Sequence, residues 1–349
     1  MRNFAIAVMF SLLSLGTAGC GPNDSNATVS NEQTASVAAR GETQAVATAN
    51  ADAADDPAIW RNAADPAASL IIGTDKKAGL YVYDLRGRQR SFIDAGRVNN
   101  VDLRDMGAAG IIVAASDRTD PLNASIALFR LNPATATLTL LGKIPAGPGE
   151  AYGICLYREG GTLFAFNVIK DGTIRQIALD LNAVPAGRIV RTLKLNSQAE
   201  GCVADERTHR LYVTEEDVGL WRFRASPNSD ANPTRIGSTD GVHIVADAEG
   251  VALAAEGPDD GGYVIVSSQG DNAYAVYRLS DDRYVGRFRI KAGNVGPTEE
   301  TDGIDIALGD FGRGYPGGLF IAQDGQNAPA AQNFKLVAFD DIKKALDLR

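Results

Sequence analysis

The sequence predicts an all-β fold, a six-bladed β-propeller whose blades are four-stranded antiparallel sheets. Two series of short strands recur six times in the same order, and from Tyr152 onward a polar residue followed by glycine recurs about every 50 residues. Repeats of this length indicate supersecondary units that stack or close on one another, and radial closure of four-stranded units gives a propeller. A β-solenoid is the weaker alternative because its repeats are shorter.

Both strand series consist of runs rich in β-branched, aromatic and aliphatic residues, bounded by Gly, Asn and Asp, as expected of strands. The runs of the first series begin at Leu70, Ile111, Leu163, Leu211, Tyr263 and Leu319. Those of the second series follow in register and begin at Leu80, Ile126, Ile174, Leu220, Tyr274 and Phe334. Each pair is therefore expected to belong to one blade.

The polar–glycine pairs each open a further strand. They are Tyr152-Gly153, Glu200-Gly201, Glu249-Gly250 and Asp302-Gly303. Because three of the polar residues are carboxylates, the repeat brings acidic groups from distant parts of the sequence to one place. That place is the predicted functional site.

The chain divides into three parts. Residues 1–20 have a positive start, an apolar stretch from Phe4 to Leu15 and small residues ending in Cys20, which predicts an export signal. The end of this segment resembles the bacterial lipoprotein cleavage box, although Thr17 stands where an aliphatic residue is usual. Residues 21–50 are rich in Ala, Ser, Thr, Asn and Gln and predict a flexible polar tether. Residues 51–349 are predicted to form the propeller.

These segments predict an exported monomer, lipid-anchored to a bacterial membrane through Cys20; a plain secretory peptide, leaving a periplasmic or secreted protein, is the alternative. A second stretch long enough to span a membrane is not seen in the sequence. The net charge of −9 argues against nucleic acid as a partner. An acidic protein can still bind an anion if a cation lies between them.

Cys155 and Cys202 are the two cysteines beyond the predicted signal. An exported protein meets an oxidising compartment, so a disulfide is possible. Their separation in space does not follow from the sequence, and two buried free thiols are the expected state.

Groups for covalent catalysis are scarce. The chain has two histidines, His209 and His243, and neither lies beside an Arg-His-Gly motif. A Gly-x-Ser-x-Gly elbow, a P-loop and an EF-hand loop are also missing from the sequence. The pattern disfavours a phosphohistidine intermediate and a histidine-rich zinc site.

Carboxylates cluster at the predicted strand ends instead. The clusters are Asp55-Asp56, Glu215-Glu216-Asp217, Asp247 with Glu249, Glu299 to Asp302, and Asp324 with Asn327. Like charges at one rim raise each other's pKa unless cations neutralise them. Calcium is the hard cation that takes carboxylate, carbonyl and amide oxygens together. The clusters therefore predict calcium sites.

Basic residues follow three consecutive copies of the first strand series. They are Lys76 with Lys77, Arg118, and Lys170. Propeller symmetry places them on one face in adjacent blades. Cations interleaved with calcium-loaded carboxylates form a site for phosphate esters.

Seven motifs along the chain together resemble the β-propeller phytases. They are Asp-Asp-Pro-Ala-Ile-Trp (55–60), Asn-Asn-Val-Asp (99–102), Glu-Gly (200–201), Glu-Glu-Asp (215–217), Ser-Ser-Gln-Gly (267–270), Thr-Asp-Gly-Ile-Asp (301–305) and Ala-Gln-Asp-Gly-Gln-Asn (322–327). The resemblance runs from Asp52 to Phe339 and implies a six-bladed, calcium-dependent phosphatase acting on myo-inositol hexakisphosphate, of the 3-phytase type.

The resemblance also implies roles for individual residues. Those matching the ligands of active-site calcium ions are Asp55, Glu200, Glu216, Asp247, Glu249 and Asp302. Those matching phosphate-binding groups are Lys76, Arg118, Tyr152 and Lys170, with Asp171 where the family can have glutamate. Asp56, Asn99 and the carbonyl of Val101 match a structural calcium site. Asp324 and Asn327 match a second one, in which Gln326 replaces an expected glutamate.

The implied mechanism is in-line attack on phosphorus by a calcium-activated water, without a covalent enzyme intermediate. The implied substrate is calcium phytate, since an acidic rim repels the free anion. Two alternatives remain open: a calcium-dependent lactonase or esterase on a six-bladed propeller, and a non-catalytic propeller that binds protein or carbohydrate.

Overall fold

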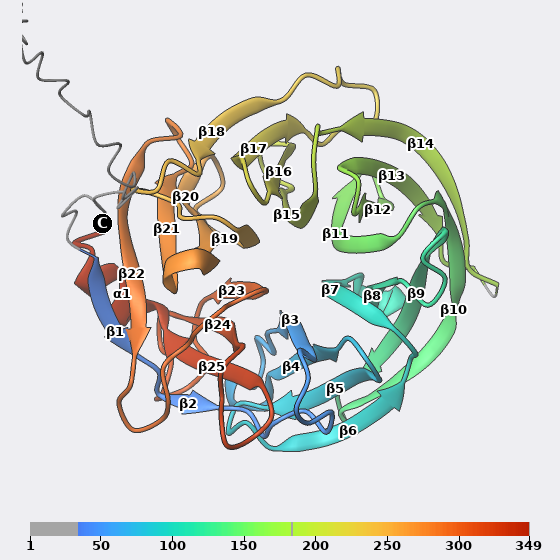
Figure 1. The fold of residues 1–349 in the computed structure, drawn as a ribbon. Coiled ribbons are helices and arrows are strands. Elements are labelled where there is room, and N and C mark those ends of the chain that lie inside the picture. The colour runs from blue at the N-terminus through green and yellow to red at the C-terminus, as the bar shows by residue number, and fades with distance from the viewer. Residues whose placement is uncertain (1–33, 183, 349) are drawn as a thin grey trace, which may run out of the picture.

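The computed structural model describes residues 34–182 and 184–348, and these form a six-bladed β-propeller around a central channel (Figure 1). The predicted signal over residues 1–20, with Cys20, lies outside the described residues. Five blades take their strands from consecutive segments, in antiparallel order from the channel outward. The predicted fold class is confirmed.

The strands of the first three blades run as follows. Blade 1 holds β3 (Ala54–Trp60), β4 (Leu70–Asp75), β5 (Gly79–Asp84) and β6 (Gln89–Asp94). Blade 2 holds β7 (Val98–Asp105), β8 (Ile111–Asp117), β9 (Asn123–Asn132) and β10 (Thr137–Pro148). Blade 3 holds β11 (Ala151–Glu159), β12 (Thr162–Ile169), β13 (Thr173–Asp180) and β14 (Ala186–Lys194).

The remaining blades complete the ring. Blade 4 holds β15 (Ala199–Asp205), β16 (Arg210–Glu215), β17 (Gly219–Arg224) and β18 (Thr234–Ser238). Blade 5 holds β19 (Ala248–Glu256), β20 (Gly261–Ser268), β21 (Ala273–Arg278) and β22 (Tyr284–Lys291). Blade 6 holds β23 (Ile304–Leu308), β24 (Gly318–Asp324) and β25 (Asn333–Ala338), and the helix α1 (Phe339–Ala345) follows. The two strand series found in the sequence are the second and third strands of every blade.

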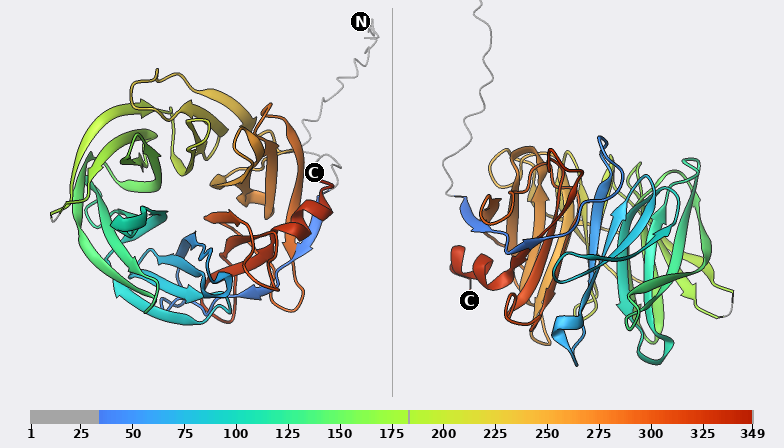
Figure 2. Two further views of the ribbon diagram at one scale, coloured as in Figure 1. Left: turned by 180° about the vertical axis from the view of Figure 1, so that it is seen from behind. Right: turned by 90° about the horizontal axis from the view of Figure 1, so that it is seen from below.

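The N-terminal segment closes the ring. Strand β2 (Gly41–Glu42) pairs antiparallel with β25 and forms the outer strand of blade 6, while β1 (Ala35–Ala38) adds a parallel fifth strand beside β22 in blade 5 (Figure 2). Val37 is buried in the core between blades 5 and 6, and Val46 in the core between blades 6 and 1. The predicted tether is therefore wrong for residues 34–50, which belong to the propeller.

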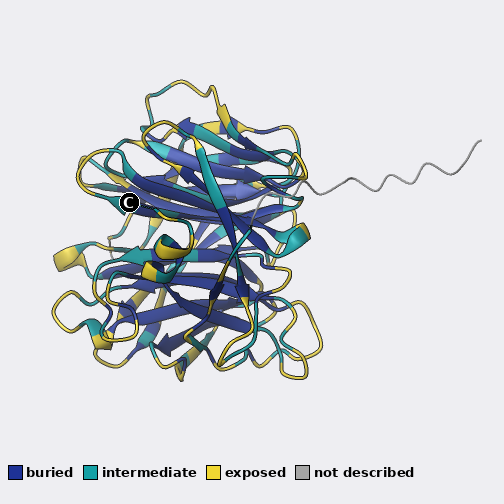
Figure 3. Ribbon diagram, turned by 90° about the vertical axis from the view of Figure 1, so that its left-hand side faces the viewer, coloured by how far each residue is buried: buried dark blue, intermediate teal, exposed yellow. Residues whose placement is uncertain are grey.

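The apolar core lies between the blades. Six clusters of buried side chains fill the six interfaces between neighbouring sheets, and the exposed residues gather in the loops (Figure 3). Ile72 and Val82 of blade 1, for example, contact the cluster that contains Val113 and Phe129 of blade 2. Each sheet is apolar on both faces, which explains why the second and third strands read as continuous apolar runs. No helix among the described residues has the length and apolar character needed to span a membrane.

The innermost strands share a bulge that positions the site. In β3, β7, β11, β15 and β19 the pairing register skips two residues, as between Ala199 and Cys202 of β15. The skipped pairs in β11, β15 and β19 are the polar–glycine pairs of the sequence. Glycine is required because a Cβ on Gly201 would lie 2.5 Å from the carbonyl oxygen of Glu249, and one on Gly250 would lie 2.6 Å from that of Asp302. Each bulge thus packs against the backbone of the next blade and turns its polar residue into the channel.

Polar side chains at the ends of the second strands hold these bulges from the neighbouring blade. Ser116 Oγ donates to the carbonyl of Tyr152 at 2.5 Å, and Thr214 Oγ1 donates to that of Glu249 at 2.5 Å. Ser267 Oγ donates likewise to the carbonyl of Thr301 at 2.8 Å. The backbone that carries the acidic residues is therefore fixed by buried hydrogen bonds across blade interfaces.

Cys155 and Cys202 form a disulfide, with Cα atoms 5.7 Å apart. The expectation of two free thiols is wrong. The bond joins the innermost strands β11 and β15 of neighbouring blades, a few residues after Tyr152 and Glu200. Propeller closure brings these strands side by side, which the sequence separation of 47 residues did not reveal.

Candidate active site

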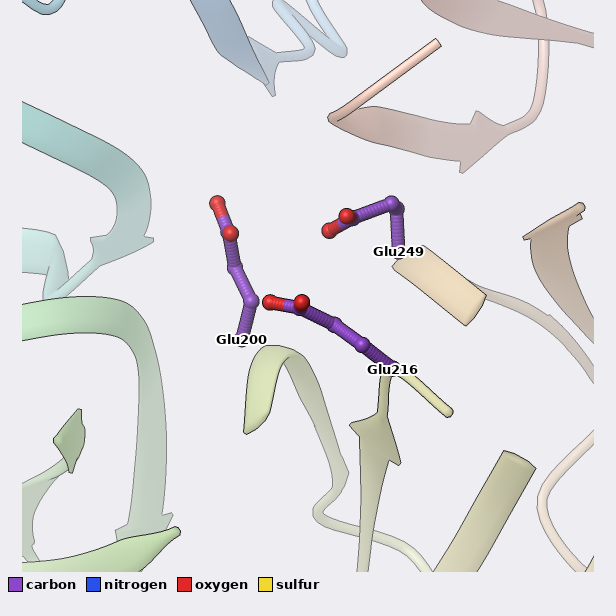
Figure 4. A group of neighbouring side chains, drawn as sticks. All are labelled: Glu200, Glu216 and Glu249. Carbon is purple, nitrogen blue, oxygen red and sulfur yellow. The ribbon is translucent and has the colours of Figure 1, made fainter. Parts of the chain in front are cut away.

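A group of carboxylates faces the channel at the end where the innermost strands begin. Glu200 and Glu249 come from the bulges of β15 and β19, and Glu216 follows β16 (Figure 4). One carboxylate oxygen from each lies within 4.8 Å of the others, and all three side chains are buried. The structure therefore brings together three of the predicted calcium ligands from two blades.

This group carries an electrostatic cost that a cation can remove. Glu249 Oε2 is buried and has no hydrogen-bond partner among the described residues. Burial, and then the charges of Asp55 and Glu249, raise the pKa of Glu200 well above its ordinary value. Burial and the charge of Asp302 do the same to the pKa of Glu249. An all-oxygen donor set with an unpartnered buried oxygen fits a hard cation such as calcium.

Lys76 follows β4 of blade 1 and contacts three further carboxylates. Its Nζ is 2.8 Å from Asp52, 2.9 Å from Asp55 and 2.9 Å from Asp302. Burial alone would lower the pKa of Lys76, but these carboxylates outweigh it and raise the pKa above its ordinary value. Burial and the charge of Asp55 raise the pKa of Asp302 to about 7 despite Lys76. Asp55, Lys76 and Asp302 thus join the site as predicted residues that the structure places in contact.

Neutral amides orient the carboxylates. Gln198 Nε2 donates to Glu216 Oε1 at 2.7 Å, and Gln269 Nε2 donates to Asp302 Oδ1 at 2.7 Å. Asn99 Nδ2 donates in the same way to Glu200 Oε1 at 2.8 Å. An amide fixes the direction of a carboxylate without cancelling its charge. Sequence reasoning missed this role of Gln198 and Gln269. The pattern that could have revealed it is a glutamine within three residues of a carboxylate at a strand end or of a glycine in one of the motifs.

Two cations stand beside the carboxylates. The guanidinium of Arg118 and the ammonium of Lys170 lie 5.5 Å and 5.0 Å from the centre of the Tyr152 ring, close enough for cation–π contact. Arg118 follows β8, Tyr152 lies in the bulge of β11, and Lys170 follows β12. Burial and the charge of Glu200 raise the pKa of Tyr152, so its hydroxyl keeps its proton. The structure brings these three predicted phosphate-binding residues together.

Asp247 and Asp171 lie at the margin. Asp247 is partly buried just before β19, and burial and the charge of Asp217 raise its pKa. Asp171 is exposed: it accepts a hydrogen bond from the Thr173 amide at 2.9 Å and lies 3.3 Å from Lys194 Nζ. Burial acts to raise the pKa of Asp171, but the contacts with Thr173 and Lys194 outweigh it and lower the pKa. Asp171 thus caps a turn and contacts Lys194.

The residues of the two predicted structural calcium sites do not fit a metal ion equally well. Asp56 is buried, and its Oδ2 accepts a hydrogen bond at 3.0 Å from the amide of Val101, whereas the predicted ligand was the carbonyl group of that residue. Asn99 instead directs its amide nitrogen to Glu200, as described above. At the second site, Asp324 Oδ2 lies 3.0 Å and Asn327 Oδ1 3.1 Å from Lys335 Nζ. The oxygens predicted to bind calcium there contact an ammonium, so the residues present do not fit a metal ion.

A polar cavity opens beside the site. It has a volume of about 910 Å³ and is lined in part by Asp52, Gln269, Glu300, Asp302 and Gln326. Cavities of this size accommodate small-molecule ligands. Its acidic wall disfavours a free anion unless cations accompany it.

Three comparisons place the chain among known proteins. A family model described as phytase matches residues 3–349. The 3-phytase of Bacillus subtilis (strain 168) is 38% identical over 336 residues, which cover 91% of this chain and 87% of that protein. The crystal structure of a calcium-binding protein, regucalcin, from Agrobacterium tumefaciens strain C58 superposes with a TM-score of 0.55 at 13% identity, over 88% of this chain and 97% of that one, and shows the fold alone. With a family match over nearly its whole length and carboxylates, amides and cations gathered at one mouth of the channel, the chain belongs to the phytase family.

Proposed function

We propose that the protein hydrolyses phosphate monoesters of phytate, myo-inositol hexakisphosphate, with calcium as its metal. The observation that carries this proposal is the juxtaposition of three buried glutamates with Arg118 and Lys170 at one channel mouth. The similarity to a 3-phytase over 91% of the chain supports phytate as the substrate.

Asp55, Glu200, Glu216, Glu249 and Asp302 would hold the metal. Calcium bound there supplies charge neutralisation for the phosphoryl group and lowers the pKa of a coordinated water. The amides of Asn99, Gln198 and Gln269 each hold one oxygen of a carboxylate and so fix the direction of that carboxylate.

The protein's own cations bind the phosphoryl oxygens. Arg118 and Lys170 both contact the ring of Tyr152, which is uncharged and neutralises neither of them. As negative charge develops on the phosphoryl oxygens, these two groups would stabilise it from beside the glutamates. Lys76 neutralises Asp55 and Asp302 in this structure, and a metal held by those oxygens would release its ammonium to bind phosphate.

Direct attack by water agrees with the side chains near the site. The Tyr152 hydroxyl keeps its proton because its pKa is raised, which makes it a poor nucleophile. His209 Nδ1 contacts the Tyr157 hydroxyl at 2.6 Å, and His243 Nδ1 contacts Asp240 at 2.6 Å. His209 lies in the turn between β15 and β16, at the end of the blade away from Glu200 and Glu216. A lactonase-type histidine beside the metal is therefore not supported.

The decisive experiment measures phosphate release from phytate by the purified protein, with calcium and after exhaustive chelation. Release in calcium that stops on chelation and returns on adding calcium back supports the proposal. Hydrolysis of lactones or phenyl esters without phosphate release would favour the lactonase or esterase, and loss of neither substrate would favour a binding propeller. A variant with Arg118→Ala and Lys170→Ala should raise the KM for phytate strongly, whereas the matched exposed pair Arg188→Ala and Lys291→Ala should not.

We also propose export of the chain as a monomer, with a lipid on Cys20 as its membrane attachment. The disulfide between Cys155 and Cys202 supports an oxidising compartment. Cell fractionation tests the anchor: the protein should sediment with membranes, and Cys20→Ser should release it to the soluble fraction. A wild-type protein found wholly in the soluble fraction would exclude the lipid.

A further inference from the structure

Lys335 is a fully buried lysine in the outer part of blade 6. It lies in β25, and its side chain has a relative exposure of 0%. A buried ammonium is costly unless charged or polar oxygens surround it. Its surroundings therefore decide what it does.

Oxygens from two segments far apart in the sequence meet this ammonium. Lys335 Nζ lies 2.6 Å from Glu42 Oε2, 3.0 Å from Asp324 Oδ2 and 3.1 Å from Asn327 Oδ1. Glu42 lies in the closing strand β2, directly opposite Lys335 in the sheet, and Asp324 ends β24. The backbone at Gly296 covers the group, since a Cβ there would lie 3.4 Å from Nζ. The ammonium thus joins the N-terminal strand to the C-terminal blade.

The same oxygens are too few for a calcium ion. Calcium takes six to eight oxygens, whereas the ammonium uses one from each of the two carboxylates. The other oxygen of Asp324 accepts hydrogen bonds from the amides of Glu299 and Gln326, at 3.2 Å and 3.3 Å. Gln326, where glutamate was expected, turns its amide nitrogen to Glu300 Oε2 at 2.6 Å and so occupies a further oxygen.

Charge also favours the ammonium over a calcium ion at this position. Burial acts to raise the pKa of Glu42, but its hydrogen bonds with Lys335 and Asn333 outweigh burial and lower the pKa. Glu42 and Asp324 are thus already matched with a cation. A divalent ion among the same oxygens would repel the ammonium at contact distance.

We propose that the ammonium of Lys335 takes the place of a structural calcium ion at the closure of this propeller. The attachment of β2 to blade 6 then needs no metal, while the channel carboxylates still do. Removing calcium empties the reaction centre and leaves the ring closed. This inference concerns closure and stands whether or not phytate is the substrate.

The first test looks for an ion directly. Crystals of the wild-type protein grown in calcium are measured at an X-ray wavelength at which calcium scatters anomalously. We expect an anomalous peak at the Glu200, Glu216 and Glu249 group and none between Asp324 and Asn327. A peak beside Asp324 overturns the proposal, whereas an empty glutamate group with no peak at Asp324 contradicts only the proposed function.

The second test uses variants in solution. In chelator, Lys335→Met should lower the melting temperature by roughly 10 °C, because removing one partner of a buried ion pair leaves charge uncompensated. The matched control is Lys343→Met, which removes a partly exposed lysine that contacts Glu256. Equal melting of the two variants overturns the proposal. Should Lys335→Met fail to fold, Asp324→Asn still decides: tightly bound calcium per chain should match the wild type, and the loss of one ion would contradict the inference.

Discussion

Glu249 shows the conflict on which this site is built. Its Oε2 is buried without a partner among the described residues, and burial, together with the surrounding carboxylates, raises the pKa of Glu249. A lone buried carboxylate opposes folding, and the same carboxylate binds a cation strongly. A residue of this kind lowers the stability of the metal-free protein and raises the affinity of the site for a metal.

Substituting Glu249→Gln separates these two effects. Phytate turnover should fall by about 100-fold or more, because a charged ligand is lost where charge develops. In chelator the melting temperature should stay the same or rise, since repulsion with Asp302 and Glu216 is removed. Steady-state kinetics and calorimetry measure the two effects, with Asp259→Asn, an exposed carboxylate in the turn between β19 and β20, as control. Near-normal turnover would show that the site is assigned wrongly.

Gln198 tests the orienting amides. Gln198→Ala removes the donor to Glu216 and should weaken calcium binding roughly tenfold, as loss of a partner behind a metal ligand does. Melting in chelator should change little, because the amide carries no charge. Titration calorimetry with calcium gives the affinity, and Gln89→Ala in the outer strand β6 is the control. An unchanged calcium affinity would show that Gln198 contributes only to packing.

At the scale of elements, the repeated bulge is the unit that builds the site. Its glycine lets neighbouring blades approach and its polar partner points into the channel. Gly201→Ala places a Cβ 2.5 Å from the Glu249 carbonyl and 2.8 Å from Thr214 Oγ1. It should cost about 1–3 kcal/mol of stability and displace Glu249. Denaturant unfolding compares it with Gly314→Ala, where no heavy atom lies within 4 Å. Equal stability of the two variants would contradict the close approach.

Elements and site were predictable to different depths. The strand series and the acidic repeat are local patterns, so the blades and the meeting of Glu200, Glu249 and Asp302 could be predicted. Strands β1 and β2 could not, because their polar sequence gains its burial only from the edges of β22 and β25. The disulfide and the partners of Lys335 depend on contacts between distant segments, which no local pattern encodes.

For the whole molecule, the pH dependence of stability should differ between the metal-free and the calcium-bound protein. Burial raises the pKa of Asp302 and of Asp305 from 3.8 to about 7. The folded state therefore binds more protons than the unfolded state between these values, and the metal-free protein loses stability as pH rises through them. The proposed calcium ion would relieve the repulsion at Asp302, and its binding would strengthen over the same pH range.

Calorimetry at pH 5.5 and pH 8 checks this prediction. In chelator the protein should melt at a higher temperature at pH 5.5. In saturating calcium the difference should shrink or reverse, with Asp302→Asn as the variant that reduces it in chelator. A metal-free protein that is more stable at pH 8 would contradict the raised pKa values.

The direction of the parallel strand β1 determines at which end of the propeller the preceding chain lies. It runs beside β22, which points toward the channel mouth that carries the carboxylates, so the chain enters β1 from the other end of the propeller. From Cys20 to residue 34 the backbone spans about 50 Å at most. With the proposed lipid on Cys20, the propeller would stand close above the bilayer with its reactive mouth turned outward. Phosphate would then be released on the side facing away from the membrane rather than against the lipid surface.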